Sequence, residues 1–124
     1  MSALMREILS GYAYHIYFNG EVGAGFADCG GLENAASSSA PRALSLQTGV
    51  LVTRDFFDWV MGHSAAQPLR LVQLDATGQV KRAWELRAAL VTKVTATTFT
   101  GNGFPFRIEV LELAVQAVSP FEEP

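Results

Sequence analysis

Cysteine, histidine and charge of either sign are scarce in this sequence of 124 residues. Cys29 is its single cysteine, so an intramolecular disulfide bond is excluded and a reducing compartment is favoured. Charged residues make up 17% of the chain, the formal net charge is −3, and Lys and Arg form no run. Tight binding to nucleic acid by phosphate neutralisation is therefore not expected, although a near-neutral wall would let a polyanion slide past it.

Long hydrophobic runs are also absent. No stretch approaches the ~20 apolar residues that a membrane-spanning helix needs, so no contact with a membrane is expected. Arg6 and Glu7 interrupt what would be the apolar core of a signal peptide. The sequence therefore predicts a protein that is made and assembled in the cytoplasm.

The residue patterns of known catalytic and metal centres are missing. The sequence has no His-x-x-x-His pair, no second cysteine, no Gly-x-Ser-x-Gly and no Walker loop. Gly23-Ala24-Gly25 has the glycine spacing of part of a phosphate-binding loop, but no helix is expected to follow it. His15 stands beside no other ligand-type residue. We therefore expect no enzymatic activity, no metal and no cofactor.

What the chain does contain is a β pattern, clearest in a predicted hairpin over residues 68–93. On its second strand one face is charged and the other is apolar, as in a half-buried antiparallel strand. The charged face carries Lys81, Glu85 and Arg87 beside Ala83, and the apolar face carries Val80, Trp84, Leu86 and Ala88, interrupted by Arg82. Residues 75–78 (Asp-Ala-Thr-Gly) supply the turn.

Further strands are expected at residues 12–18, around Phe26, at 43–52 and at 90–99, with Gly49 as a bulge or bend. Asn19-Gly20 marks a turn, and Asn102-Gly103 marks a hairpin. The last strand starts at Phe106 and changes its apolar face after Val110, which implies either a bulge or a strand that passes from one packing environment into another. A helix over 108–115 is the alternative.

One short amphipathic helix is expected after the strand at 43–52. Thr53 is a plausible N-cap, and Phe56, Trp59, Val60 and His63 follow at helical spacing. We interpret this aromatic stripe as a lid on the sheet.

A chain of this length forms a single domain over residues 1–124. Residues 1–11 are either a frayed terminus or an arm that docks on a neighbouring subunit, and the latter makes Leu4, Ile8 and Leu9 interface candidates. Residues 35–43 are expected to form an exposed loop, and 119–124 an acidic tail.

The order of these features resembles the tail-tube protein family of contractile phages and contractile injection systems. The resemblance runs through about residues 12–118. Its most specific part is the hairpin, with Leu71-x-x-Leu74-Asp75-x-x-Gly78 followed by Trp84-x-Leu86-x-x-Ala89-x-x-x-Lys93. The remaining matches are Tyr14, Ile16, Phe18 and Gly20; Gly25-Phe26 and Gly31-Leu32; Leu46, Gly49, Asp55 and Trp59; and the closing strand Ile108-Glu109-Val110-Leu111-Glu112-Leu113.

The resemblance implies an antiparallel β-sandwich or barrel with one short α-helix, whose copies close into a six-fold ring with one continuous barrel around a lumen. Stacked rings would conduct DNA or protein cargo without binding it specifically, inside a sheath and next to baseplate or spike proteins, in a virion tail or injection-system particle. Interface candidates in the central loop are Ser37, Ser38, Ser39, Pro41 and Arg42, and candidates for the lumen wall are Thr92, Thr95, Thr97 and Thr98.

Residues 34–43 are shorter than the corresponding segment of the family, which normally reaches neighbouring subunits. A baseplate-proximal initiator or adaptor ring that does not polymerise is therefore an alternative to a main tube subunit. A monomeric β-barrel that binds an apolar ligand is a third hypothesis.

Overall fold

The computed structural model describes residues 9–30, 42–62, 65–96 and 106–120. Seven strands and one helix lie in these ranges: β1 (Tyr14–Phe18), β2 (Glu21–Gly30), β3 (Arg42–Leu51), α2 (Arg54–Gly62), β4 (Gln67–Leu74), β5 (Val80–Ala96), β6 (Phe106–Val115) and β7 (Ala117–Pro120). Every pairing between these strands is antiparallel. The predicted mainly β fold with one short helix is confirmed.

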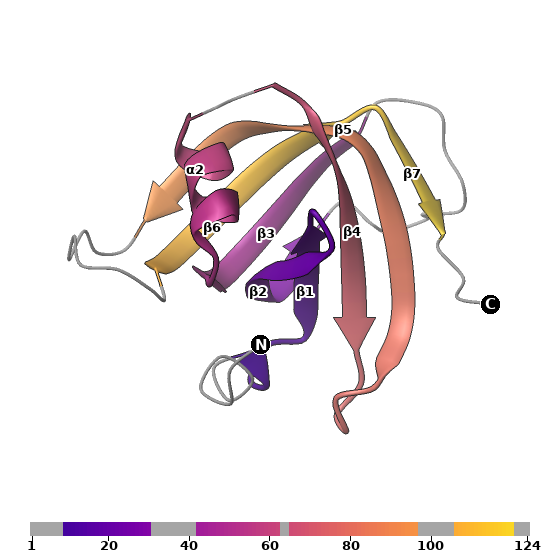
Figure 1. Cartoon of the computed structure of the whole chain (residues 1–124). Helices are drawn as coiled ribbons and strands as arrows, with labels where there is room; N and C mark the ends of the chain where they lie inside the picture. The colour runs from indigo at the N-terminus through magenta and orange to yellow at the C-terminus, as the bar shows by residue number, and fades with distance from the viewer. Residues whose placement is uncertain (1–8, 31–41, 63–64, 97–105, 121–124) are drawn as a thin grey trace.

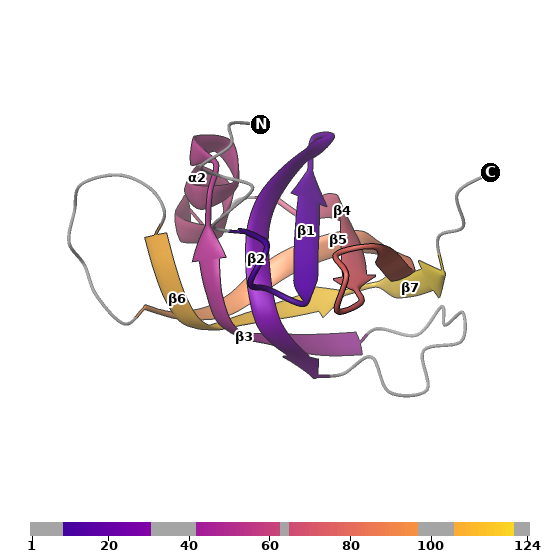
Figure 2. The same ribbon diagram turned by 90° about the horizontal axis from the view of Figure 1, so that it is seen from below.

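The sheet closes into a barrel of six strands (Figure 1). Its order is β4-β1-β2-β3-β6-β5, and β4 also pairs with β5. β5 is long enough to pair with β4 over its first half and with β6 over its second half. Seen from below, β1 and β2 cross β5 and β6 at a steep angle, and β3 bends between the two layers (Figure 2).

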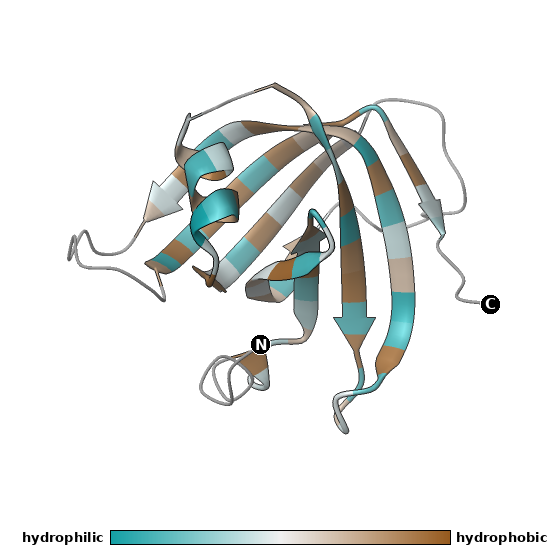
Figure 3. Cartoon of the chain, in the orientation of Figure 1, coloured by the Kyte–Doolittle hydropathy of each residue, from teal (hydrophilic) through white to brown (hydrophobic). Residues whose placement is uncertain are grey.

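The barrel interior is filled by apolar side chains from every described strand and from α2. Trp84, Phe26 and Leu111 are among them, and polar and apolar residues alternate in bands along the strands (Figure 3). The helix closes one end of the barrel through the predicted aromatic stripe. Phe56 and Trp59 both contact Phe18, with ring centroids 5.5 and 5.7 Å away.

The helix begins where the sequence predicts. The Phe56 backbone N–H donates to the Thr53 hydroxyl at 3.3 Å, as an N-cap requires. The indole Nε1 of Trp59 donates to the carbonyl of Ala65 at 2.9 Å, which ties the helix to the chain that follows it. Of the predicted stripe, His63 lies outside the described residues.

Both predicted turns that lie in the described residues are present. Asn19 and Gly20 have φ values of 54° and 81°, which suit the tight β1–β2 hairpin. In the β4–β5 turn, the Asp75 carboxylate accepts from the Thr77 hydroxyl at 2.6 Å and from the backbone N–H of Gln79 at 3.0 Å. These hydrogen bonds, led by that from Thr77, lower the pKa of Asp75. The turn at Asn102-Gly103 lies outside the described residues.

The bend predicted at Gly49 is also present. The neighbouring Thr48 has a φ of 54°, and it has no partner in the ladders of β3 with β2 and β6. A Cβ on Gly49 would collide with the ring of Phe26 and would lie 2.6 Å from the carbonyl oxygen of Gly25. The bend therefore places the bare backbone of Gly49 against a large core side chain.

The last barrel strand is a strand throughout, so the helical alternative is wrong. β6 carries one extra residue, Glu109, opposite the Thr95–Ala96 step of β5. Ile108 and Leu111 can therefore both be buried although they lie an odd number of residues apart. The predicted bulge is confirmed.

The predicted faces of β5 need two corrections. Ala88 is only partly buried, because it has a φ of 51° and forms a bulge against β4, after which Ala89 and Val91 take the inward positions. Val80 is 60% exposed, because a second register shift places Lys81 as an extra residue opposite β4. The second strand of the predicted hairpin over 68–93 and the strand predicted at 90–99 form one strand, β5, which is continuous through these bulges as far as Ala96; residues 97–99 lie outside the described residues.

The end of the chain also differs from the sequence expectation. Ser119 and Pro120, predicted to start the tail, belong to β7 and pair with Glu85 and Trp84 of β5. β7 continues β6 in the same register, and the Gln116 N–H donates to the Arg87 carbonyl at 2.9 Å between them.

Candidate functional site

The candidate site is the outward face of the four neighbouring strands β2, β3, β6 and β5, which we call the open face. Directly paired residues of antiparallel strands point to the same side of a sheet, so the register defines the rows of this face. Its rows are Ala43–Ala114–Leu90, Gly30–Ser45–Glu112–Lys93 and Asp28–Gln47–Val110–Thr95. The inward face of the same strands is the apolar core.

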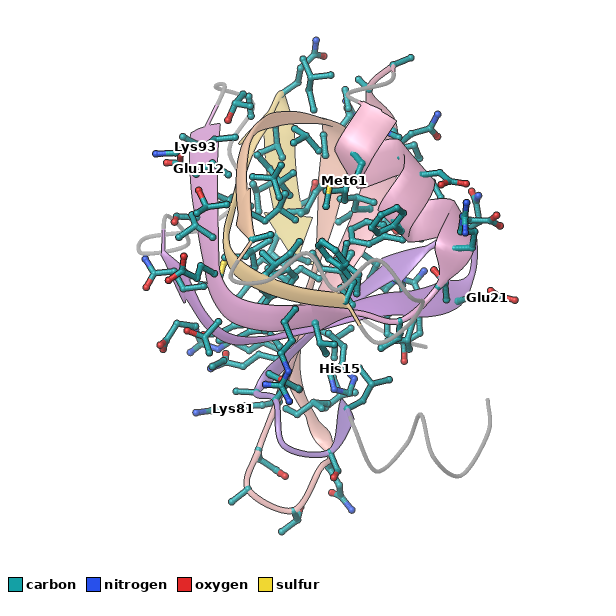
Figure 4. The ribbon with its side chains drawn as sticks, turned by 90° about the vertical axis from the view of Figure 1, so that its left-hand side faces the viewer. His15, Glu21, Met61, Lys81, Lys93 and Glu112 are labelled. Carbon is teal, nitrogen blue, oxygen red and sulfur yellow. The ribbon has the colours of Figure 1, made fainter. Side chains whose placement is uncertain are left out.

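The open face has small side chains and little charge. Its rows carry one cation, Lys93, and two carboxylates, Asp28 and Glu112. Lys93 and Glu112 are paired across β5 and β6 and lie beside each other (Figure 4). Alanine, serine, glutamine and threonine make up most of the rest, so the face offers a large partner neither a deep apolar pocket nor a strong field.

The predicted lumen residues of β5 lie on this face. Thr92 is exposed at a bulge of β5, and its hydroxyl donates to the backbone carbonyl of Glu112 at 3.1 Å. Thr95 is partly exposed and stands opposite Val110. Thr97 and Thr98 lie outside the described residues.

The open face is bordered by two strand edges. The β1–β2 ladder ends at Phe26 and does not continue along Ala27–Gly30. β4 pairs with β5 only as far as Ala89, so within the described residues Leu90–Ala96 has no partner strand on that side. These edges bound the same row, the one that runs from Gly30 to Lys93. Unpaired edges carry backbone groups that another strand can bind.

The N-terminal candidate Leu9 lies against the paired residues Gly25 and Val50, away from the three rows of the open face. It is 2% exposed and packs with Val22, Val50 and Val52 in a small cluster outside the barrel. The ring Nε2 of His15 lies 3.0 Å from the Leu9 carbonyl oxygen and, as the donor tautomer, holds this segment. Burial lowers the pKa of His15, although the hydrogen bond to Leu9 opposes the shift.

Of the other interface candidates, the structure describes Arg42 alone. Leu4, Ile8, Ser37, Ser38, Ser39 and Pro41 lie outside the described residues. Arg42 begins β3 and pairs with Val115.

Sequence reasoning found part of the open face and missed its edges. Thr92 and Thr95 are visible as a threonine-rich stretch, but Gly30, Ser45 and Gln47 give no signal of their own. The edges of the open face are set by the points where β1 stops pairing with β2 and β4 stops pairing with β5. The residues of β2 and β5 show no local pattern that predicts these points.

The described residues show no group of three or more His, Cys, Asp or Glu arranged to hold a metal ion. No helix among them is both long and apolar enough to cross a membrane.

The chain matches a known protein family. The sequence pattern of the T4-like virus tail tube protein gp19 matches residues 34–119, which is more than half of the chain. It covers the segment from before β3 to β7, and so includes three of the four strands of the open face. No curated protein matches the chain significantly.

Proposed function

The chain belongs to the family of the T4-like virus tail tube protein gp19, and we propose that it forms stacked hexameric rings of the inner tube of a contractile tail or injection system. In this role it is a structural subunit with no chemistry of its own. The rings guide DNA or protein cargo through their lumen without binding it specifically.

The observation that supports ring formation is that the β1–β2 ladder ends at Phe26 and the β4–β5 ladder ends at Ala89, at the two outer strands of one sheet. Strand direction alternates across β2, β3, β6 and β5, so β5 of one subunit and β2 of the next would run antiparallel. Pairing the Leu90–Ala96 edge with the Ala27–Gly30 edge of a neighbour would extend the sheet by a whole subunit. Repetition around a closed ring leaves no edge unpaired, which removes the aggregation hazard of the free subunit.

The open face then lines the lumen. Its small side chains give a smooth wall, and its weak charge avoids the ion pairs that would hold a phosphate backbone. The opposite face cannot serve this purpose, because it is the filled core of the subunit. Sheath protein would surround the ring from outside, and baseplate or spike proteins would contact the end of the tube.

Native mass spectrometry combined with negative-stain electron microscopy on the purified protein tests this function. Six-subunit rings or stacked tubes are expected. Rings that never stack would favour the initiator or adaptor ring next to the baseplate. A clean monomer at high concentration would contradict self-assembly and favour the ligand-binding barrel, although side chains fill the interior that such a ligand would need.

A proline scan of Lys93, Val94 and Thr95 tests the edge itself. Backbone N–H groups of a strand point alternately to its two sides, and proline has no N–H group. Depending on its position, a proline in this scan therefore removes either an N–H group that donates a hydrogen bond to β6 or an N–H group that points to the outer edge of β5. A variant whose outer N–H group is removed should keep the thermal stability of the monomer and fail to form rings. If every stable variant still forms rings, this edge is not the contact between subunits.

A further inference from the structure

A cavity of about 370 Å³ lies beside the base of the β4–β5 hairpin. It is lined by Val80–Ala83 of β5, by Arg70 and Val72 of β4, and by Tyr17 of β1. The hairpin projects from the barrel (Figure 1), and Figure 4 places Lys81 at its base, away from Lys93 and Glu112 of the open face. The cavity is therefore separate from the candidate site described above.

A β-bulge brings two adjacent cations to this cavity. In a regular strand, Lys81 and Arg82 would point to opposite faces of the sheet. Here the register shifts between Gln73 and Leu74 of β4, so that Lys81 is an extra residue on β5, and both cations line the same cavity. Bulges often lie next to functional sites, where they redirect a side chain. The irregularity of β5 therefore concentrates positive charge at one point of the surface.

The cavity carries a net positive charge. Lys81 and Arg82 are exposed, and in the described part of the chain neither has a carboxylate within ion-pair distance. The third cation, Arg70, lies 3.8 Å from the carboxylate of Glu85, which balances its charge. Two positive charges therefore remain for a ligand. A dianion would neutralise both, whereas a single carboxylate would leave one of them uncompensated.

The hydrogen-bond donors of the cavity suit a phosphate group. Guanidinium groups donate paired hydrogen bonds to oxyanions, and a lysine ammonium group adds a compact charge. The phenol of Tyr17 supplies one further donor. A phosphate monoester group carries a charge of about −1.5 to −2 at pH 7, which matches the two uncompensated cations.

The remaining wall of the cavity is apolar and consists of Val72, Val80 and Ala83. A few polar groups beside apolar side chains are typical of small-molecule sites, which have volumes of about 300–1,000 Å³. The volume of this cavity falls in that range, so it has room for an organic group beside the phosphate.

We propose that this cavity binds a phosphate group, either as inorganic phosphate or as the end group of a small organic monoester. Lys81 and Arg82 bind the phosphate oxygens, Arg70 and Tyr17 complete the set of donors, and the apolar wall contacts the organic group. A small ligand is favoured over a nucleic acid because the cations converge on one cavity and do not form a stripe along the surface. The proposal goes beyond the tube function and does not depend on it.

NMR titration of the isotope-labelled protein, at a concentration where it is monomeric, tests the proposal. The probes are inorganic phosphate, adenosine 5′-monophosphate and adenosine. We expect both phosphate probes to shift the amide signals of Val72, Lys81 and Arg82 until they saturate, and adenosine to leave these signals unchanged. Tighter binding of the monophosphate would identify an organic monoester as the ligand, and equal binding would identify inorganic phosphate. The absence of saturable shifts up to about 10 mM of either phosphate probe would overturn the proposal.

Substitutions test the residues of the site. K81Q combined with R82Q should weaken phosphate binding by at least about tenfold, because two charged donors are lost. K93Q is the matched control: Lys93 is a cation of the same strand, but it lies beside Glu112 on the open face. Its substitution should change the affinity by less than about twofold, since solvent and salt screen a distant charge. An equal loss in K93Q would show a response to overall charge and overturn the site.

E85Q should have the opposite effect. It removes the carboxylate that competes with the ligand for Arg70, so phosphate should bind about threefold more tightly. A gain in affinity cannot result from unfolding, and unchanged or weaker binding would contradict the role of Arg70. A tetraglutamate peptide that shifts the same signals with equal or higher affinity than phosphate would assign the cavity to an acidic protein partner and overturn the proposal.

Discussion

At the residue scale, the absence of a side chain at Gly49 lets the Phe26 ring lie against β3. A Cβ there would collide with that ring and approach the Gly25 carbonyl oxygen to 2.6 Å. G49A should therefore lower the free energy of unfolding by about 1–3 kcal/mol, the usual cost of overpacking a core. Urea unfolding measures it. G30A is the control and should have a much smaller effect, since its Cβ would meet only the Ser45 carbonyl oxygen at 4.0 Å.

The adjacent Thr48 presents the opposite case. Its φ of 54° is a left-handed conformation that is unfavourable for a β-branched residue. Relief of that strain, roughly 1–2 kcal/mol, should exceed the loss of about 0.5–1 kcal/mol that glycine brings through chain entropy. T48G should thus raise the midpoint of urea unfolding slightly. The same substitution at Gln47, which is exposed in regular strand geometry, should lower it; a loss in both variants would show that Thr48 is not strained.

His15 should make the docking of the N-terminal segment sensitive to acid. Burial lowers its pKa below the usual 6.5, so the folded state favours the neutral ring. A depressed folded pKa means that this contribution to stability is complete above pH 6.5 and is lost as the pH falls through the folded value. We expect NMR titration to give a pKa below 6.5 for His15 and to move the Leu9 and Tyr12 amide signals with it. H15Q should abolish the movement of those amides in this range, and its persistence would assign it to another group.

At the element scale, the helix α2 depends on its cap. The Thr53 hydroxyl accepts from the Phe56 N–H, and Phe56 is a fully buried residue that packs on the strands below. T53A should cost about 1 kcal/mol of stability, while T53S should retain most of it because serine also caps helices well. Thermal unfolding of the three proteins compares them. A loss of equal size in T53S would point to the methyl group rather than the cap.

The elements were largely predictable from the sequence, and their irregularities were not. Alternation located β5 and its charged face, and the cap and aromatic spacing located α2. The bulges at Ala88 and Lys81 depend on how β4 and β5 fit around the barrel. Neither alanine nor lysine is a residue type that predicts a bulge. The sequence did not predict β7, because a Ser-Pro pair usually marks the end of a helix or strand. Here Pro120 is the last residue of a short edge strand.

At the scale of the whole molecule, the two faces of one sheet have different roles. The inward face of β2, β3, β6 and β5 holds the core, and the outward face is available to line a channel. The sequence shows the first directly, because apolar residues mark it. The role of the outward face cannot be read from the sequence, because it depends on where the strand ladders of the barrel end. Of the residues predicted for the lumen wall, Thr92 and Thr95 lie in the described strands.

A bulky residue on the open face gives the sharpest test of the channel. Gln47 is exposed at the middle of a row, so Q47W should leave the stability of the subunit nearly unchanged. In assembled tubes, we expect cryo-electron microscopy to show added density that narrows the lumen at one level per ring. D58W on the exposed side of α2 is the matched control, and its density should lie outside the tube wall. If the Q47W density appeared on the exterior or between rings, the open face would not line the lumen, and β5 and β2 would have to contact neighbouring subunits in another geometry.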